Sequence, residues 1–390
     1  MILTNCRLLP ELSGGIASEN GSVEILNGKI IQVSAQPSCA PDAFDCGGGT
    51  LLPGLIDLHT HITILGGVGA GKEHDPQAVL IDAMECARRF LDYGFTTIRD
   101  CGSINRAAHY VRDAVNRGII EGPRIFSSGR QISTSADSPK NAATNASINF
   151  ADGEADTRRA VREECVNLAD FIKIYASGSA YLPTGIPKHP IMDYDEICAA
   201  VNAARANGRY VAAHCHADSA IRSCIRAGVR TIEHATFLGS ETLQLLLDTP
   251  DCWLVPTFSA MYVSQTDPEA KAFWEARLNP MLRQCADAIG EAYRQGAKIG
   301  FGTDSSAVMT QYRLGKEFQM RHELAGMAPI DILTQATKTN AEILGLSDVI
   351  GEIRNGLCAD LALFCGNPDK GFTVMYDRPA HVWKCGELVR

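Results

Sequence analysis

The chain has 390 residues, of which 45% are hydrophobic and 21% are charged, and its formal net charge at pH 7 is −9. This length suits one large barrel or two domains of a globular protein. No apolar run approaches the roughly 18 residues that a membrane span needs, and no tract of Lys or Arg offers a surface for nucleic acid or an anionic membrane.

The first segment, Met1–Arg7, lacks the pattern of a signal peptide, and the 14 cysteines include no Cys-x-x-Cys motif. We therefore expect a cytoplasmic protein whose cysteines act as small buried hydrophobic residues. We also expect a homo-oligomer that acts on a small molecule, with neither nucleic acid nor membrane as a partner.

Both ends of the chain contain short β-like runs. Within residues 1–53, two such runs are joined by Asn27-Gly28, which is a strong hairpin signal, and residues 346–390 contain similar runs. Neither end is long enough to bury a core alone. We therefore expect the two ends to pair into one small β-sandwich domain.

Residues 54–345 alternate short apolar segments with amphipathic helical segments, which predicts a (β/α)₈ TIM barrel of the α/β class. Several of the helical segments stop at a glycine, which closes a helix in the left-handed conformation. These glycines are Gly94, Gly118, Gly208, Gly228 and Gly296. The eight expected strands are centred near Ile56, Ile98, Phe126, Ile172, Val211, Ile232, Leu254 and Gly300. A doubly wound parallel sheet is the alternative.

Five of the ten histidines lie at the ends of three expected strands, and an aspartate ends a fourth. Residues i and i+2 of a strand point to the same face, and the strand ends of a barrel meet around one axial pocket. Neutral imidazoles and a carboxylate are ligands that Zn²⁺ accepts, although an aspartate after Gly-Thr also commonly caps a helix. The residues of this set are His59, His61, His214, His216, His234 and Asp304.

Lys173 lies between Ile172 and Ile174 in another expected strand, where an unpaired charge is costly. The residue either pairs with a carboxylate or has reacted with CO₂ to form a carbamate, whose two oxygens would bridge two metal ions. We favour the carbamate because an ammonium group cannot ligate a metal. Tyr175 follows two residues later and shares the same face.

These segments together resemble the amidohydrolase superfamily. The similarity is closest to the branch that contains imidazolonepropionase-like proteins, Xaa-Pro dipeptidases and carboxypeptidases specific for basic residues. The matching segments are Pro53–His61, Lys173–Gly178, Ala213–His216, Ala227–His234, Gly302–Asp304 and Gly351–Ala362.

The resemblance implies a binuclear Zn²⁺ centre, or another divalent metal, with a carboxylated lysine. The implied ligands are His59, His61, Lys173, His214, His234 and Asp304. Strand parity alone leaves His214 and His216 equivalent. The resemblance favours His214 as the ligand and leaves His216 to contact substrate or to support the site.

The expected reaction is hydrolysis of a C–N bond in a dipeptide, an N-acyl amino acid or a cyclic amide, through a metal-bridging hydroxide. Asp304 would carry the proton to the leaving amine, and Tyr175 would bind the oxyanion or a substrate carboxylate. Lys188 and Arg130 are further candidates for the distant end of a substrate. The alternatives are a mononuclear deaminase of an aminated heterocycle and a non-enzymatic binding protein.

Two loops bear on specificity. Residues 129–137 lack the Gly- and His-rich loop that is common in the peptidase-like members, and so the substrate stays open. Residues 66–73 nearly match a phosphate-binding loop, but Glu73 stands where a hydroxyl should bind Mg²⁺. We expect this segment to be a flexible loop over the pocket.

Overall fold

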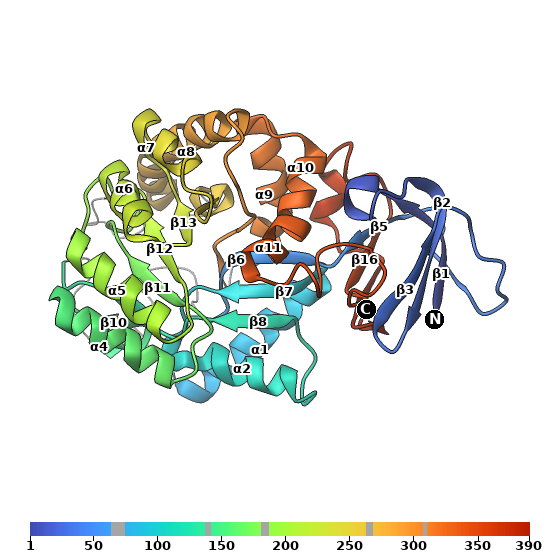
Figure 1. Ribbon diagram of the computed structural model, residues 1–390, viewed down its shortest axis with the longest axis horizontal. Helices are drawn as coiled ribbons and strands as arrows, with labels where there is room; N and C mark the ends of the chain where they lie inside the picture. The colour runs from blue at the N-terminus through green and yellow to red at the C-terminus, as the bar shows by residue number, and fades with distance from the viewer. Residues whose placement is uncertain (64–74, 137–141, 181–186, 263–267, 307–309) are drawn as a thin grey trace.

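The computed structural model describes residues 1–63, 75–136, 142–180, 187–262, 268–306 and 310–390. A mixed sheet that contains both ends of the chain stands beside a larger region of parallel strands, and helices surround those strands (Figure 1). Among the described residues, no helix is long and apolar enough to cross a membrane.

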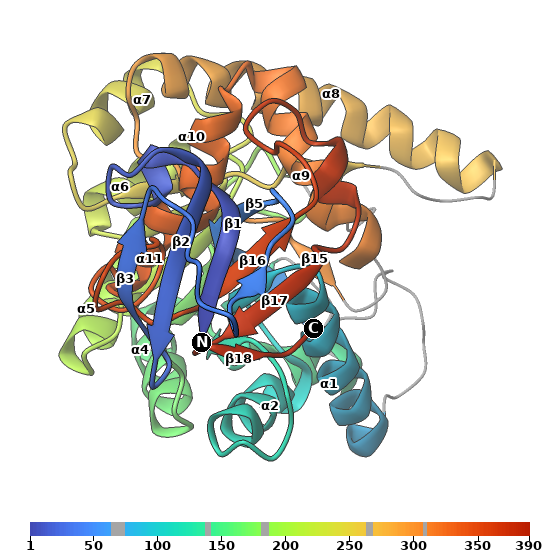
Figure 2. The ribbon, with the colours of Figure 1, turned by 90° about the vertical axis from the view of Figure 1, so that its right-hand side faces the viewer.

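The mixed sheet contains strands from both ends of the chain, and Figure 2 shows them together. Its order is β18-β17-β16-β5-β1-β2-β3, and β4 pairs with β1. Its strands are β1 (Ile2–Leu8), β2 (Ser18–Leu26), β3 (Lys29–Ser34), β4 (Phe44–Asp45), β5 (Thr50–Pro53), β16 (Leu361–Phe364), β17 (His381–Lys384) and β18 (Glu387–Leu388).

The two chain ends share one hydrophobic core. Val23 from the N-terminal part and Trp383 from the C-terminal part belong to the same cluster of buried side chains. The predicted hairpin is confirmed: Leu26 pairs with Lys29, and Asn27 and Gly28 both have positive φ.

The other strands are parallel to their neighbours and form two sheets, of order β10-β9-β11-β12-β13-β14 and β15-β6-β7-β8. Seven of the expected strands are present, and β9, β10 and β15 were not expected. The strands are β6 (Leu55–His61), β7 (Phe95–Asp100), β8 (Arg124–Ser127), β9 (Gln131–Ser133), β10 (Ile148–Phe150), β11 (Ile172–Tyr175), β12 (Val211–Cys215), β13 (Thr231–His234), β14 (Trp253–Val255) and β15 (Ser305–Ser306).

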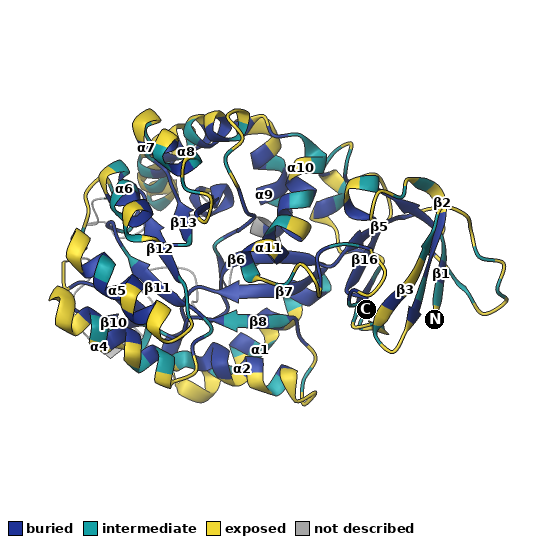
Figure 3. Cartoon of the chain, viewed as in Figure 1, coloured by how far each residue is buried: buried dark blue, intermediate teal, exposed yellow. Residues whose placement is uncertain are grey.

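Helices cover the parallel strands, whose residues are largely buried while the outer helix faces are exposed (Figure 3). All five glycines predicted to stop helices have positive φ, as expected. The α-helices are α1 (Pro76–Asp92), α2 (Ala107–Asn116), α3 (Ala142–Ser147), α4 (Gly153–Val166), α5 (Tyr194–Ala206), α6 (Asp218–Ala227), α7 (Ser240–Leu247), α8 (Pro268–Arg294), α9 (Thr310–Ala325), α10 (Pro329–Thr334) and α11 (Asn340–Leu344). Shorter helical turns are η1 (Pro10–Leu12), η2 (Ile104–Arg106), η3 (Phe258–Met261), η4 (Gln335–Thr339) and η5 (Thr373–Tyr376).

The eighth expected strand, near Gly300, is not a regular strand. Within residues 297–304, all of them described, Ile299 alone forms a β-bridge, to Leu254. The side chain of Asn340 replaces part of the ladder here: its amide oxygen accepts from the Phe301 N–H at 2.9 Å, and its NH₂ donates at 2.8 Å to the Phe301 carbonyl, which also accepts from the Leu58 N–H of β6. An amide side chain thus satisfies the Phe301 N–H, which a regular ladder would otherwise pair.

Backbone hydrogen bonds nevertheless join the two parallel sheets at both seams. The 297–304 segment bonds to β14 through Gly300 N–H and to β6 through Leu58 N–H. At the other seam, the Asp170 N–H just before β11 donates to the Ser127 carbonyl at the end of β8, at 2.9 Å. The carboxyl ends of β6, β11, β12 and β13 therefore face a common region.

Candidate metal centre and active site

The side chains predicted to form a site meet at these strand ends, although they come from separate parts of the sequence. Lys173 Nζ lies 3.2 Å from His59 Nε2. Asp304 Oδ1 lies 3.7 Å from His59 Nε2 and 3.4 Å from His61 Nε2. The first and fourth expected strands and the Gly-Thr-Asp segment therefore converge on one place.

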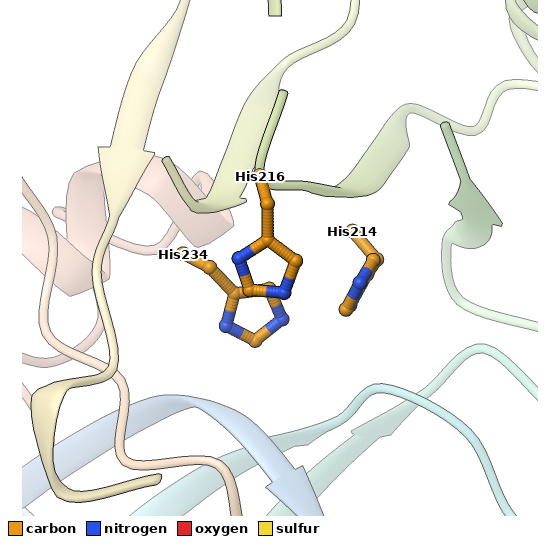
Figure 4. A group of neighbouring side chains, drawn as sticks. All are labelled: His214, His216 and His234. Atoms are coloured by element: carbon orange, nitrogen blue, oxygen red, sulfur yellow. The ribbon is translucent and has the colours of Figure 1, made fainter. Parts of the chain in front are cut away.

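Three further histidines face one another beside this group (Figure 4). One nitrogen of each of His214, His216 and His234 can be chosen so that all three atoms lie within 4.8 Å of one another. The rings of His216 and His234 are stacked, with centroids 4.8 Å apart, and the His214 ring stands edge-on to both. His234 also belongs to a second such group, with His59 and Asp304, so it links the two halves of the site.

Most of these imidazoles are anchored through Nδ1. His59 Nδ1 lies 2.8 Å from Glu233 Oε2, and His61 Nδ1 lies 3.0 Å from the Gly102 carbonyl. His216 Nδ1 and His234 Nδ1 each lie 2.7 Å from a threonine hydroxyl, those of Thr236 and Thr257. An anchored Nδ1 fixes the ring orientation and leaves Nε2 for another partner.

Burial keeps four of these histidines neutral. Burial is the main cause, and the positive charge of Lys173 a further one, that lowers the pKa of His59 to about 4 and that of His216 to about 3. The pKa values of His214 and His234 are lowered well below the usual value, again chiefly by burial. Neutral imidazole is the form that binds a metal.

Glu233 binds His59, and Arg99 in turn binds Glu233. The sequence patterns assigned no role to either residue. Arg99 and Glu233 are fully buried, and Arg99 Nη2 lies 2.6 Å from Glu233 Oε1. Burial alone would raise the pKa of Glu233, but the charge of Arg99 and the hydrogen bond with His59 lower it to about 2. The sequence did carry a signal for this pair, since each residue places a charged side chain inside an apolar strand. Buried charges of this kind are normally paired with an opposite charge.

Asp57 connects β6 to the segment that carries Asp304. Its carboxylate accepts from the His59 N–H at 3.0 Å and from the hydroxyl of Thr303 at 2.6 Å. Burial raises the pKa of Asp57 to about 7. The carboxyl group therefore fixes the backbone on both sides of the site.

The backbone is in the left-handed region at two of the site residues. His234 has φ 69° and Asp304 has φ 54°, and Ala235 next to His234 has φ 53°. Non-glycine residues in this region are uncommon and cluster at functional sites.

The three residues predicted to contact substrate lie in different surroundings. The half-buried ring of Tyr175 stacks on His214 with centroids 4.3 Å apart, beside the site. Lys188 Nζ lies 5.0 Å from the centroid of Phe237, three residues beyond His234. Arg130 instead pairs with Glu163 and Glu164, and its guanidinium holds α4.

Parts of the loops named from the sequence lie outside the described residues. Residues 66–73 and Asp137 belong to this set. Residues 131–133 of the loop after the third expected strand form β9.

The donor set fits a metal ion. His214 Nε2 is buried without a hydrogen-bond partner among the described residues. Unpaired buried nitrogens are costly, and neutral imidazoles with a carboxylate are typical ligands of Zn²⁺. A bound metal ion would satisfy these atoms.

A model of the amidohydrolase family matches residues 50–389. The chain belongs to the amidohydrolase family. The resemblance seen in the sequence motifs is therefore confirmed, and as an amidohydrolase the protein is an enzyme rather than a binding protein.

Similar proteins cover most or all of this chain. Ochratoxinase from Aspergillus niger is 26% identical over 370 residues, which cover 87% of this chain and 75% of that protein. The structure of an Xaa-Pro dipeptidase with methionine bound in the active site is 28% identical, with a TM-score of 0.86, over 100% of this chain and 99% of that one. The structure of a prolidase complexed with N-methylphosphonate-L-proline is 30% identical, with a TM-score of 0.88 and the same coverage.

Proposed function

We propose that this amidohydrolase is a metal-dependent enzyme that hydrolyses the amide bond of a small molecule, such as a dipeptide, an N-acyl amino acid or a cyclic amide. The observation that carries the proposal is the meeting of neutral, anchored histidines with Lys173 and Asp304 at one set of strand ends. These side chains are better suited to binding a metal ion than to acid–base catalysis by histidine, because burial keeps the imidazoles of His59 and His216 unprotonated.

The proposed ligands are His59, His61, His214, His234 and Asp304 with Lys173 as its carbamate. Two bound divalent ions, Zn²⁺ in the proposal, would lower the pKa of a water and polarise the substrate carbonyl. A carbamate suits position 173 because an ammonium 3.2 Å from His59 Nε2 would repel cations. His216, anchored by Thr236, would support the site or contact substrate.

Asp304 would hold and move the proton. Its carboxylate lies beside His59 and His61 and is partly exposed, with 14% of the side chain accessible. It would accept a proton from the attacking water and deliver it to the leaving nitrogen. Tyr175, stacked on His214, would bind the developing oxyanion or a substrate carboxylate.

The dipeptidase and prolidase neighbours support a dipeptide-like substrate. The loop after the third expected strand departs from the peptidase-like pattern, so the proposal keeps N-acyl amino acids and cyclic amides beside dipeptides. Lys188 near Phe237 supports a substrate with a carboxylate at its far end.

The experiment is a substrate panel with metal-loaded enzyme, accompanied by measurement of the metal content per chain. We expect about two metal ions per chain and release of an amino acid from at least one amide. Release of ammonia from an aminated heterocycle, with one metal ion and no amide cleaved, would establish the mononuclear deaminase instead.

The architecture in this proposal is a closed (β/α)₈ barrel over residues 54–345 and a small β-sandwich domain from residues 1–53 and 346–390. The hydrogen bonds at both sheet seams and the core shared by the chain ends support these boundaries. A homo-oligomer and a cytoplasmic location stay predictions, of which sedimentation analysis of the purified protein tests the first.

A further inference from the structure

Two cysteines far apart in the sequence meet at the edge of the mixed sheet. The Cys358 thiol donates to Cys385 Sγ at a distance of 3.1 Å. Cys385 is exposed and Cys358 is half-buried. Of the two residues in contact, Cys385 is therefore the more accessible to solvent.

Cys385 occupies an unusual place for its residue type. It begins the two-residue turn between β17 and β18, where Lys384 pairs with Glu387, and both Cys385 (φ 49°) and Gly386 (φ 79°) are left-handed. The equivalent turn between β2 and β3 has Asn27 at this position, which is the residue that such turns favour. A cysteine in this strained backbone conformation points to a functional role for its thiol.

The surroundings of the pair favour a thiolate on balance. Asp360 Oδ1 accepts from the Cys385 N–H at 2.8 Å and lies 3.3 Å from the Cys358 sulfur, and its other oxygen pairs with Arg124 at 2.9 Å. The hydrogen bond from Cys358 is the main cause that lowers the pKa of Cys385 to about 7. Burial and the charge of Asp360 oppose this shift, and the positive charges of Arg124 and Lys384 add to it. Reactive cysteines occupy such exposed, electropositive surroundings.

Three other cysteines interact with one another but are closed to solvent. These residues, Cys215, Cys224 and Cys252, are all buried, and burial raises the pKa of Cys215 and of Cys252. Cys39 and Cys365 are exposed. Among the described residues, the pair of Cys358 and Cys385 combines contact between two sulfurs with access from solvent.

We propose that Cys358 and Cys385 form a dithiol site that a hydroperoxide oxidises reversibly to a disulfide. The Cys385 thiolate attacks the peroxide, breaks the O–O bond and becomes a sulfenic acid, while the other oxygen leaves as water or alcohol after taking a proton. The Cys358 thiol then attacks this sulfur, forms the S–S bond and releases the hydroxyl as a second molecule of water. The peroxide gains two electrons and the two thiols lose two.

A disulfide fits this place better than a metal ion. Asp360 is the third possible ligand, but it is already paired with Arg124, and Lys384 brings a second positive charge near the sulfurs. Positive groups weaken the binding of a cation and stabilise a thiolate. The site belongs to the mixed sheet and does not depend on the proposed hydrolysis.

The test uses the full-length protein, reduced and then treated with hydrogen peroxide before alkylation, digestion and mass spectrometry. We expect a peptide pair joined through Cys358 and Cys385, two hydrogen atoms lighter than the separate peptides, with loss of alkylation at both residues. Dithiothreitol should restore both alkylated peptides.

Matched variants make the result specific. Cys365→Ala, which removes an exposed cysteine, should still form the cross-link, whereas Cys385→Ala and Cys358→Ser should each abolish it. Circular dichroism checks that each variant is folded. Oxidation of Cys385 to sulfinic acid without a cross-link would overturn the proposal. So would a zinc ion beyond those of the active site that the wild type retains and Cys385→Ala loses.

Discussion

The orientation of His59 depends on charged residues that do not reach the site themselves. Glu233 binds His59 Nδ1 through one oxygen and Arg99 through the other. Glu233→Gln would leave the fully buried Arg99 without its counter-ion, so we expect a loss of about 3–5 kcal/mol in the free energy of unfolding. Urea denaturation measures this loss, and Glu241→Gln, at a side chain that is 87% exposed, is the matched control. Equal stability of the two variants would contradict a buried ion pair at this place.

Lys173 is the residue that separates a binuclear centre from a mononuclear one. Removal of its side chain in Lys173→Ala should reduce the metal content and the activity together, since the proposed carbamate would bind both ions. Short carboxylic acids should restore part of both, because their two oxygens replace those of the carbamate. Metal analysis and turnover with and without added acid provide the measurement, and full activity of the untreated variant would rule out the binuclear interpretation.

Asp304 is proposed to act as a proton carrier as well as a ligand. Asparagine retains an oxygen that can approach a metal but cannot carry the proton. We therefore expect Asp304→Asn to keep most of the bound metal while kcat falls about 10²–10⁴-fold. Parallel metal analysis and kinetics test this separation. Near-normal turnover would reduce Asp304 to a structural cap of its turn.

At the scale of elements, the irregular 297–304 segment places Asp304 only because it lies very close to β6. A Cβ atom on Gly302 would stand 2.9 Å from His59 Cβ and 2.7 Å from Val255 Cγ1. Gly302→Ala should therefore displace the segment, lower turnover and cost about 1–3 kcal/mol of stability. Gly371→Ala is the control, since its Cβ would meet no atom within 4 Å. Kinetics and urea denaturation compare the two variants, and similar behaviour would show that the close approach is not needed.

Sequence patterns predicted the elements whose information is local. The apolar runs that end in His61 and His234 identified their strands, and glycines such as Gly228 identified helix ends. The segment expected as a strand near Gly300 is irregular where the side chain of Asn340, which is distant in the sequence, pairs with the backbone of Phe301. Glu233 was missed for a related reason: alternation along a strand shows which face a residue occupies, but not that Arg99 from another strand neutralises it.

At the scale of the whole molecule, specific ion pairs strengthen the contacts of the two chain ends with each other and with the parallel strands. Arg7 of β1 makes a bidentate pair with Asp369, at 2.6 and 2.9 Å. Arg124 at the start of β8 pairs with Asp360, just before β16. The mixed sheet thus depends on C-terminal residues, which are synthesised last, although most of its strands lie near the N-terminus.

This arrangement leads to a prediction that separates stability from catalysis. Trp383 is fully buried in the core shared by both chain ends, and that core is distinct from the one around the parallel strands. Trp383→Ala should cost about 3–5 kcal/mol of unfolding free energy because it leaves a large cavity. The metal content and kcat of the folded fraction should stay unchanged, since no site residue belongs to this core. Leu388→Ala, at an exposed position of the same hairpin, is the control. Urea denaturation combined with kinetics below the transition gives both readouts, and a loss of kcat without a loss of stability would show that the mixed sheet shapes the active site directly.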